Sequence, residues 1–215
     1  MDLRTKFKRF GGEHIPDIVE YLLDWTKSSP GVTTSIGCDS LQKKRRTTFA
    51  VTIMLYNSDI RNGAHIVFFR ESLPKIRDNF ERLQREAQFV LDLGEFLEVE
   101  LVGYQRSDLS IDERKRYKYH MAKSDGQYSQ VLDEYQALRG IPLTDSEINA
   151  FYKKVDLHLD FNPFETTQNK NRSSKNKSHL AYTTFVPWLR GMGFRVWSKP
   201  NSHASSSAAD LLVQD

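Results

Sequence analysis

The order of its segments predicts that the chain folds as a mixed α/β protein. Near the N-terminus, three β-prone runs joined by short turns predict an antiparallel meander, at residues 33–39, 47–56 and 64–71. Farther along, strand and helix patterns alternate as in βαβ units, at residues 155–161, 178–190, 194–199 and from 205 onward. Five strands in a mixed α/β layout follow from this order.

An amphipathic helix at residues 15–25 precedes the meander. Its apolar residues recur at helical spacing and are Ile15, Ile18, Val19, Leu22 and Leu23. Pro16 suits a first turn, where a backbone N–H would have no helical acceptor. Within the meander, the Asn-Gly pair in residues 58–63 predicts the second turn.

A long helix is predicted at residues 74–97. Its apolar stripe consists of Ile76, Phe80, Leu83, Ala87, Val90 and Leu97. Residues 98–103 fit either the end of this helix or a strand. The polar, aromatic-rich segment 104–154 has a helical pattern. We expect it to be a helical insertion within a single domain that spans residues 1–215.

The C-terminal third begins with a clearly alternating strand at residues 155–161. Asp156, His158 and Asp160 share the face opposite to its apolar residues. A polar loop is expected at 164–177. The helix at 178–190 contains Pro187, which should kink or split it because proline clashes with the preceding turn. A terminal helix is expected from residue 205.

The composition is that of a globular protein without disulfides. The 215 residues are 39% hydrophobic and 27% charged, which suffices for a core. The single cysteine, Cys38, excludes an intrachain disulfide and a CxxC zinc site. No apolar run reaches the roughly 18 residues of a membrane span, and no signal peptide is evident. We therefore expect a cytoplasmic protein with no membrane partner.

Basic residues cluster in this mildly basic chain of net charge +3. Residues 43–46 are all Lys or Arg, residues 114–118 mix Arg and Lys with tyrosine, and residues 170–177 contain four cations and no acid. One such run usually marks a solvated loop or helix face. Three runs in a small chain favour a polyanionic partner.

Four carboxylates lie at strand ends or on the predicted helices, at positions where they could meet. Asp39 ends the first β run, Glu86 lies beside the apolar stripe of the long helix, Asp160 ends the strand at 155–161, and Asp210 follows small residues in the terminal helix. Each has an ordinary interpretation, as a turn-initiating Asp, a helix boundary residue, part of an edge strand with one wet face, or a first-turn helix acid.

Taken together, the four acids indicate a metal site. Clustered carboxylates repel one another unless positive charge lies among them. Two divalent metal ions about 4 Å apart are a common solution, and they support in-line phosphoryl displacement. Oxygen ligands favour Mg²⁺ or Mn²⁺ over zinc. The chain contains no Walker loop, dinucleotide fingerprint or Ser-His-Asp elbow that would suggest another chemistry.

Three motif blocks follow one another over nearly the whole chain, interrupted by residues 104–154. They are Ser35-Ile36-Gly37-Cys38-Asp39-Ser40, then His158-Leu159-Asp160-Phe161-Asn162-Pro163, then a tail from Gly191-Met192-Gly193-Phe194 through Lys199-Pro200-Asn201-Ser202 to Ala208-Ala209-Asp210. In this order the blocks resemble the YkuK-type family of predicted ribonuclease-H-like nucleases of bacteria and phages.

The resemblance implies a ribonuclease-H-like fold. In that fold a five-stranded mixed sheet has helices on both faces; its first three strands are antiparallel, and the fourth lies parallel to the first. The resemblance also implies that two Mg²⁺ or Mn²⁺ ions bind the catalytic carboxylates Asp39, Glu86, Asp160 and Asp210. His203, in the loop after the last strand, is either a surface histidine or a residue that assists proton transfer or product release.

The basic residues near these acids are the expected nucleic-acid contacts. One run follows Asp39 and another follows Asp160, so both should lie near the same end of the sheet. With one further lysine from the tail motif, the expected contacts are Lys43, Lys44, Arg45, Arg46, Lys170, Arg172, Lys175, Lys177 and Lys199. Tyrosines in the insertion either stack single-stranded bases or pack the insertion onto its host domain.

Two functions remain in competition. The first is a divalent-metal-dependent nuclease that hydrolyses phosphodiester bonds in RNA, DNA or an RNA–DNA hybrid. The second is a catalytically weak or inactive module on the same fold that binds a nucleic acid or a protein partner, because a fold does not fix a function. Metal binding distinguishes the two.

Overall fold

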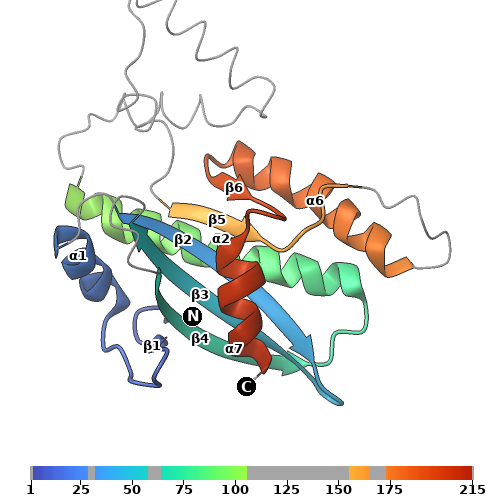
Figure 1. Ribbon diagram of the computed structural model, residues 1–215, viewed down its shortest axis with the longest axis horizontal. Coiled ribbons are helices and arrows are strands. Elements are labelled where there is room, and N and C mark those ends of the chain that lie inside the picture. Colours follow the sequence, from blue (N-terminus) through green and yellow to red (C-terminus); the bar gives the residue numbers. More distant parts are fainter. Residues whose placement is uncertain (1, 29–31, 58–63, 106–154, 165–172, 215) are drawn as a thin grey trace, which may run out of the picture.

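A six-stranded mixed sheet is the centre of the computed structural model (Figure 1). The structure describes residues 2–28, 32–57, 64–105, 155–164 and 173–214. The strand order across the sheet is β1-β4-β3-β2-β5-β6. These strands are β1 (Lys8–Arg9), β2 (Val32–Gln42), β3 (Arg46–Asn57), β4 (Ala64–Pro74), β5 (Val155–Leu159) and β6 (Arg195–Trp197).

The pairing of the strands follows the expectation. Strands β2, β3 and β4 form an antiparallel meander, and β5 lies parallel to β2 on its other side. Strand β6 then pairs parallel to β5. The expected count of five is wrong by one, because β1 adds an edge strand beside Val67 and Phe68 of β4. Two residues are too short to show the alternation that reveals a strand in a sequence.

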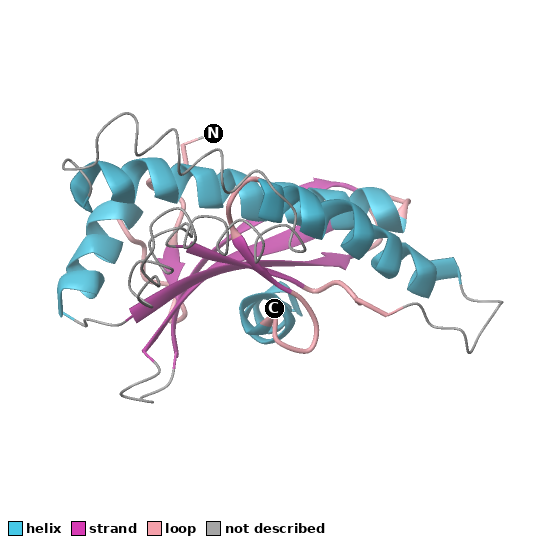
Figure 2. Ribbon diagram, turned by 90° about the horizontal axis from the view of Figure 1, so that it is seen from above, coloured by secondary structure: helices cyan, strands magenta, loops and turns pink. Residues whose placement is uncertain are grey.

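Helices cover both faces of the sheet, as expected. Figure 2 shows α1 (Ile18–Ser28), α2 (Asn79–Gln105) and α6 (Ser173–Gly191) on one face. The π-helix η1 (Ala204–Ala209) runs directly into α7 (Asp210–Gln214), and this pair lies on the other face. Within the ranges given above, no helix is both long and apolar enough to cross a membrane.

Several predicted boundaries shift. Helix α1 begins at Ile18, so Pro16 precedes it, and the ambiguous residues 98–103 are helical. The expected loop at 164–177 is wrong from Ser173 onward, where α6 begins. Helix α6 continues across Pro187 without the expected split. The expected turn at 58–63 and all but the first two residues of the expected insertion at 104–154 lie outside the described residues.

Two apolar clusters hold these layers together. The larger cluster packs the sheet against α1, α2 and α6 and includes the buried Cys38. The smaller cluster packs α7 on the opposite face and consists of Ala50, Phe68, Ala209, Leu212 and Val213. The side of β2 and β5 that carries polar residues therefore faces η1 and α7.

A close backbone approach fixes the position of η1. A Cβ atom built on Gly37 of β2 would lie 2.3 Å from the carbonyl carbon of Ala204 and 2.4 Å from the nitrogen of Ser205. The Thr52 hydroxyl of β3 donates to the Ala204 carbonyl oxygen at 2.9 Å. Only a glycine leaves room for η1 to lie directly on β2, and this contact carries Asp210 toward the carboxyl end of that strand.

Candidate functional site

Asp39 and Asp160 are brought together by the sheet register. Cys38 of β2 pairs with Leu159 of β5. Asp39 directly follows Cys38, and Asp160 directly follows Leu159. Strand β5 lies between β2 and β6, and all five of its residues are buried. The edge-strand interpretation of residues 155–161 is therefore wrong, and the two acids stand at the carboxyl ends of two central parallel strands.

The charge environment of Asp39 shows which acids are its neighbours. Burial, together with the negative charges of Asp160 and Asp210, raises the pKa of Asp39 to about 6 against the opposing effects of the Ser40 backbone N–H and Arg82. The Ser40 N–H donates to Asp39 Oδ1 at 2.8 Å. Asp210, 50 positions after Asp160 in the chain, thus belongs to the same electrostatic neighbourhood.

Glu86 reaches this neighbourhood from α2, on the other face of the sheet. Its side chain is fully buried, and its Oε1 atom accepts hydrogen bonds from the Ser40 hydroxyl at 2.5 Å and from Arg82 Nη1 at 3.0 Å. Burial raises the pKa of Glu86 to about 8, with contributions from the charges of Asp39 and Asp160, and outweighs the opposing effect of Arg82. Burial therefore favours the protonated form of Glu86, and the ion pair with Arg82 favours the charged form.

Arg82 is a site residue that the sequence analysis missed. Its Nη1 atom donates to the carbonyl oxygen of Ser40 at 3.1 Å and to the Ser40 hydroxyl at 2.6 Å, besides its ion pair with Glu86. The signal was available, since Arg82 and Glu86 lie four residues apart on one helix and such pairs share a face. Ser40 lies in the first motif block, but nothing in the sequence pointed to its contact with α2.

Asp160 has one satisfied and one unsatisfied oxygen. Its Oδ2 atom forms an ion pair with Lys199 Nζ at 2.8 Å. Its Oδ1 atom is buried and has no hydrogen-bond donor among the described residues. A buried carboxylate oxygen is costly to leave unpaired, so this atom marks a place where a cation or a donor would be stabilised.

The two histidines near the site differ in role. His158 is buried on β5, and its Nδ1 atom accepts a hydrogen bond from the Ala204 N–H at 3.1 Å, so it serves as a support for η1. Burial and, to a smaller extent, the nearby His203 lower the pKa of His158 to about 4. His203 itself is exposed and directly precedes η1. It therefore lies beside the polar face of β5, in contact with solvent.

The expected basic contacts are only partly placed. Residues 43–46 are exposed in the turn between β2 and β3, where the Lys43 N–H donates to the Arg46 carbonyl oxygen at 2.8 Å. Lys177 forms an ion pair with Asp78 instead of standing alone. Lys170 and Arg172 lie outside the described residues, and of Lys175 only the helical backbone is described.

The described residues do not form a ready metal centre. Among them, no three His, Cys, Asp or Glu side chains lie close enough together to hold a metal ion. Arg82 and Lys199 instead neutralise Glu86 and Asp160. The donor chemistry nevertheless fits Mg²⁺ or Mn²⁺, because it consists of carboxylate oxygens and includes the unpaired Oδ1 of Asp160. A bound metal would require these side chains to move together.

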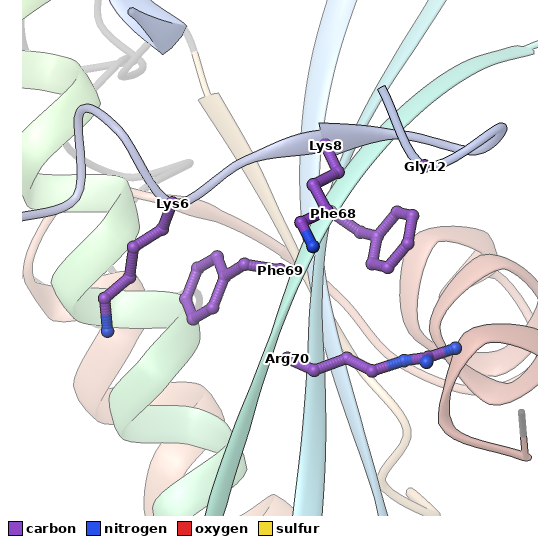
Figure 3. A pocket seen from close by; sticks show the side chains of 6 residues that line it. All are labelled: Lys6, Lys8, Gly12, Phe68, Phe69 and Arg70. Atoms are coloured by element: carbon purple, nitrogen blue, oxygen red, sulfur yellow. The ribbon is translucent and has the colours of Figure 1, made fainter. Parts of the chain in front are cut away.

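A separate pocket lies at the opposite edge of the sheet. It has a volume of about 410 Å³ and is lined by Lys6, Lys8, Gly12, Phe68, Phe69 and Arg70 (Figure 3). Lys6 is paired there with Glu71 at 2.9 Å, and Arg70 lies over the Phe68 ring at 5.5 Å from its centroid. None of the predicted site residues lines this pocket.

The comparison with known families agrees with this fold. The chain matches the family described as Ribonuclease H-like over residues 15–125, which is more than half of its length. The chain belongs to that ribonuclease-H-like family, as the motif blocks indicated. No curated protein and no solved structure matches it.

Proposed function

We propose that the protein is a divalent-metal-dependent nuclease that hydrolyses phosphodiester bonds of RNA, DNA or an RNA–DNA hybrid. One observation carries the proposal. Four acids from β2, α2, the end of β5 and the start of α7 influence one another electrostatically at the carboxyl ends of the central strands. Negatively charged acids that raise one another's pKa destabilise the folded state, so a protein that keeps them together has a use for them.

Asp39 and Asp160 are the central ligands in this proposal. They are adjacent on neighbouring strands, and Asp160 Oδ1 is the unpaired oxygen. Glu86 and Asp210 flank them from opposite faces of the sheet. Two bound Mg²⁺ or Mn²⁺ ions would supply an activated water and stabilise the leaving oxygen.

The remaining residues hold the nucleic acid and handle protons. The exposed turn 43–46 continues β2 beyond Asp39 and offers four cations to a phosphate backbone. His203, exposed beside the polar face of β5, is positioned to exchange a proton with solvent or with the leaving group. Glu86, with a pKa raised to about 8 mainly by burial, must lose its proton before it can act as a ligand.

A cleavage panel with a matched variant tests the proposal. Labelled single-stranded RNA, single-stranded DNA, duplex DNA and hybrid are incubated with Mg²⁺, Mn²⁺ or EDTA. Asp160→Asn should lower the cleavage rate by at least about 100-fold while the protein stays folded, because a central ligand is lost. Asp92→Asn, an exposed acid elsewhere on α2, is the control and should cleave normally. Full activity of Asp160→Asn would remove the assignment.

The second candidate is a binding module without catalysis. The observation that favours it is that Arg82 and Lys199 already neutralise two of the four acids, so the charges are balanced without a metal. Calorimetric titration with Mn²⁺ separates the two functions. Two binding sites support the nuclease, whereas no uptake at millimolar Mn²⁺, with nucleic-acid binding retained, supports the module.

A further inference from the structure

Lys199 and Arg82 balance the acids of the site in different ways. Arg82 makes three hydrogen bonds through one nitrogen, one of them to the backbone of Ser40, and its side chain is only 22% exposed. Lys199 contacts Asp160 through a single ion pair, and its side chain is 49% exposed. Arg82 is therefore held in place, whereas the Lys199 ammonium can leave at little cost.

The backbone of Lys199 stays at the site even when its ammonium moves. The Lys199 N–H donates to the Phe161 carbonyl oxygen at 3.3 Å, which ties the chain after β6 to the residue that follows Asp160. The flexible four-carbon side chain of Lys199 then lets its ammonium reach different positions around the carboxyl end of β5. A phosphate bound near Asp160 lies within that reach.

We propose that Lys199 is a phosphate-contacting residue whose availability is controlled by Asp160. While the Asp160 carboxylate is charged and holds no other cation, it retains Lys199 and removes that cation from nucleic-acid binding. When the carboxylate is neutralised by another cation, Lys199 is released to a backbone phosphate. This inference rests on the proposed function in that it takes a nucleic acid as the ligand of the site.

The consequence is a coupling between two ligands. A cation that takes the Asp160 carboxylate releases one lysine to the nucleic acid, so each ligand strengthens the binding of the other. The same release follows from Asp160→Asn without any metal, because the amide carries no charge to hold Lys199. The inference can therefore be tested in EDTA, independently of catalysis.

The experiment is a double-mutant cycle on nucleic-acid binding in EDTA. The probe is a fluorescently labelled single-stranded oligonucleotide, as RNA and as DNA, and its affinity is measured by anisotropy over a range of salt concentrations. The proteins are wild type, Asp160→Asn, Lys199→Met and the double variant. Asp160→Ala serves as a second release variant, and thermal melts report whether each protein is folded.

Asp160→Asn should steepen the slope of log K against log salt by about 0.7, the value for one added phosphate contact on a single strand. In the Lys199→Met background the same change should leave the slope unaltered. Lys199→Met alone should keep the wild-type slope, because in wild type the ammonium is held by Asp160 and makes no phosphate contact in EDTA. The matched control is the Lys6–Glu71 pair, where Glu71→Gln should leave the slope unchanged.

Three results would overturn the inference. These are an equal change of slope by Asp160→Asn with and without Lys199, a shallower slope in Lys199→Met while Asp160 is intact, and no binding of either oligonucleotide. After the third result, the cleavage panel, which includes metal, duplex DNA and hybrid, decides whether nucleic acid remains the ligand of the proposed function. The first two leave the nuclease intact, because the cleavage panel with Asp92→Asn as control reports on it separately.

Discussion

Replacement of Gly37 by alanine tests how the fold positions the fourth acid. The new Cβ atom would lie 2.3 to 2.5 Å from three backbone atoms of Ala204 and Ser205. Ordinary carbon contacts are about 3.5 to 4.0 Å, so η1 would have to move by more than about 1 Å. Because the obstructing atoms belong to the backbone, no side-chain rotation relieves the overlap.

The cost can be bracketed from the contacts that η1 and α7 make. Repacking in place costs up to about 3 kcal/mol, the upper range for overpacked interiors. Detachment of the segment instead exposes Leu212 and Val213, which together contribute about 3 to 6 kcal/mol when buried. Because the protein adopts the less costly of the two responses, we expect Gly37→Ala to lower the free energy of unfolding by about 1 to 3 kcal/mol.

Urea unfolding measures this loss, and hydrogen exchange of the α7 amides shows whether the segment has detached. Gly94→Ala is the matched control, since its Cβ would meet movable side-chain atoms of Leu157 and Phe194 at 3.0 Å. Its helix-propensity gain of about 1 kcal/mol offsets part of that crowding, so it should change the stability little. A Gly37→Ala protein within 1 kcal/mol of wild type would refute the argument.

Two further predictions concern buried charge. Burial raises the pKa of Glu86 from 4.5 to about 8. Between about pH 5 and 8, the folded state therefore keeps a proton that the unfolded state loses. In EDTA, the free energy of unfolding should fall as the pH rises through that window. Glu86→Gln should flatten this slope in urea titrations at pH 5, 6.5 and 8; an unchanged slope would assign it to another group. Arg195→Met should cost about 2 to 4 kcal/mol, because it removes the cation that pairs with the buried Asp156 carboxylate at 2.6 Å through Nε. The Trp197 indole N–H, at 3.0 Å from Asp156, is a neutral donor and does not replace that charge. Arg9→Met, which breaks an exposed pair with Glu13, should cost less than about 1 kcal/mol in the same thermal and urea assays, and equal losses would contradict the distinction.

The sequence predicted the parts of the fold that depend on local pattern. The meander, α1, α2 and the alternation of β5 follow from periodicities of two and 3.6 residues, which act within one segment. Strand β1 and the first turn of α6 were missed because two residues show no period and a polar Ser-Ser-Lys-Asn start carries no apolar stripe.

The site was predictable in its residue types and less so in its geometry. The positions of Asp39 and Asp160 at strand ends could be read locally, but their adjacency depends on β2 and β5 being neighbours, which came from the family resemblance. The contact of Gly37 with Ala204 joins residues far apart in the chain. A single glycine in a strand does not indicate which segment packs against it. The ion pair between Asp160 and Lys199 likewise needs the three-dimensional structure.

The place where residues 106–154 join the fold has a consequence for how this protein can diversify. They leave from the end of α2 and return at Val155, the first residue of β5, whereas Asp160 follows the other end of that strand (Figure 1). The Val155 N–H donates to Glu98, which lies twelve residues after Glu86, or about 18 Å along α2. The two attachment points are thus separated from Asp160 by β5 and from Glu86 by this stretch of α2, so the sequence at these points can change without a direct contact to either acid.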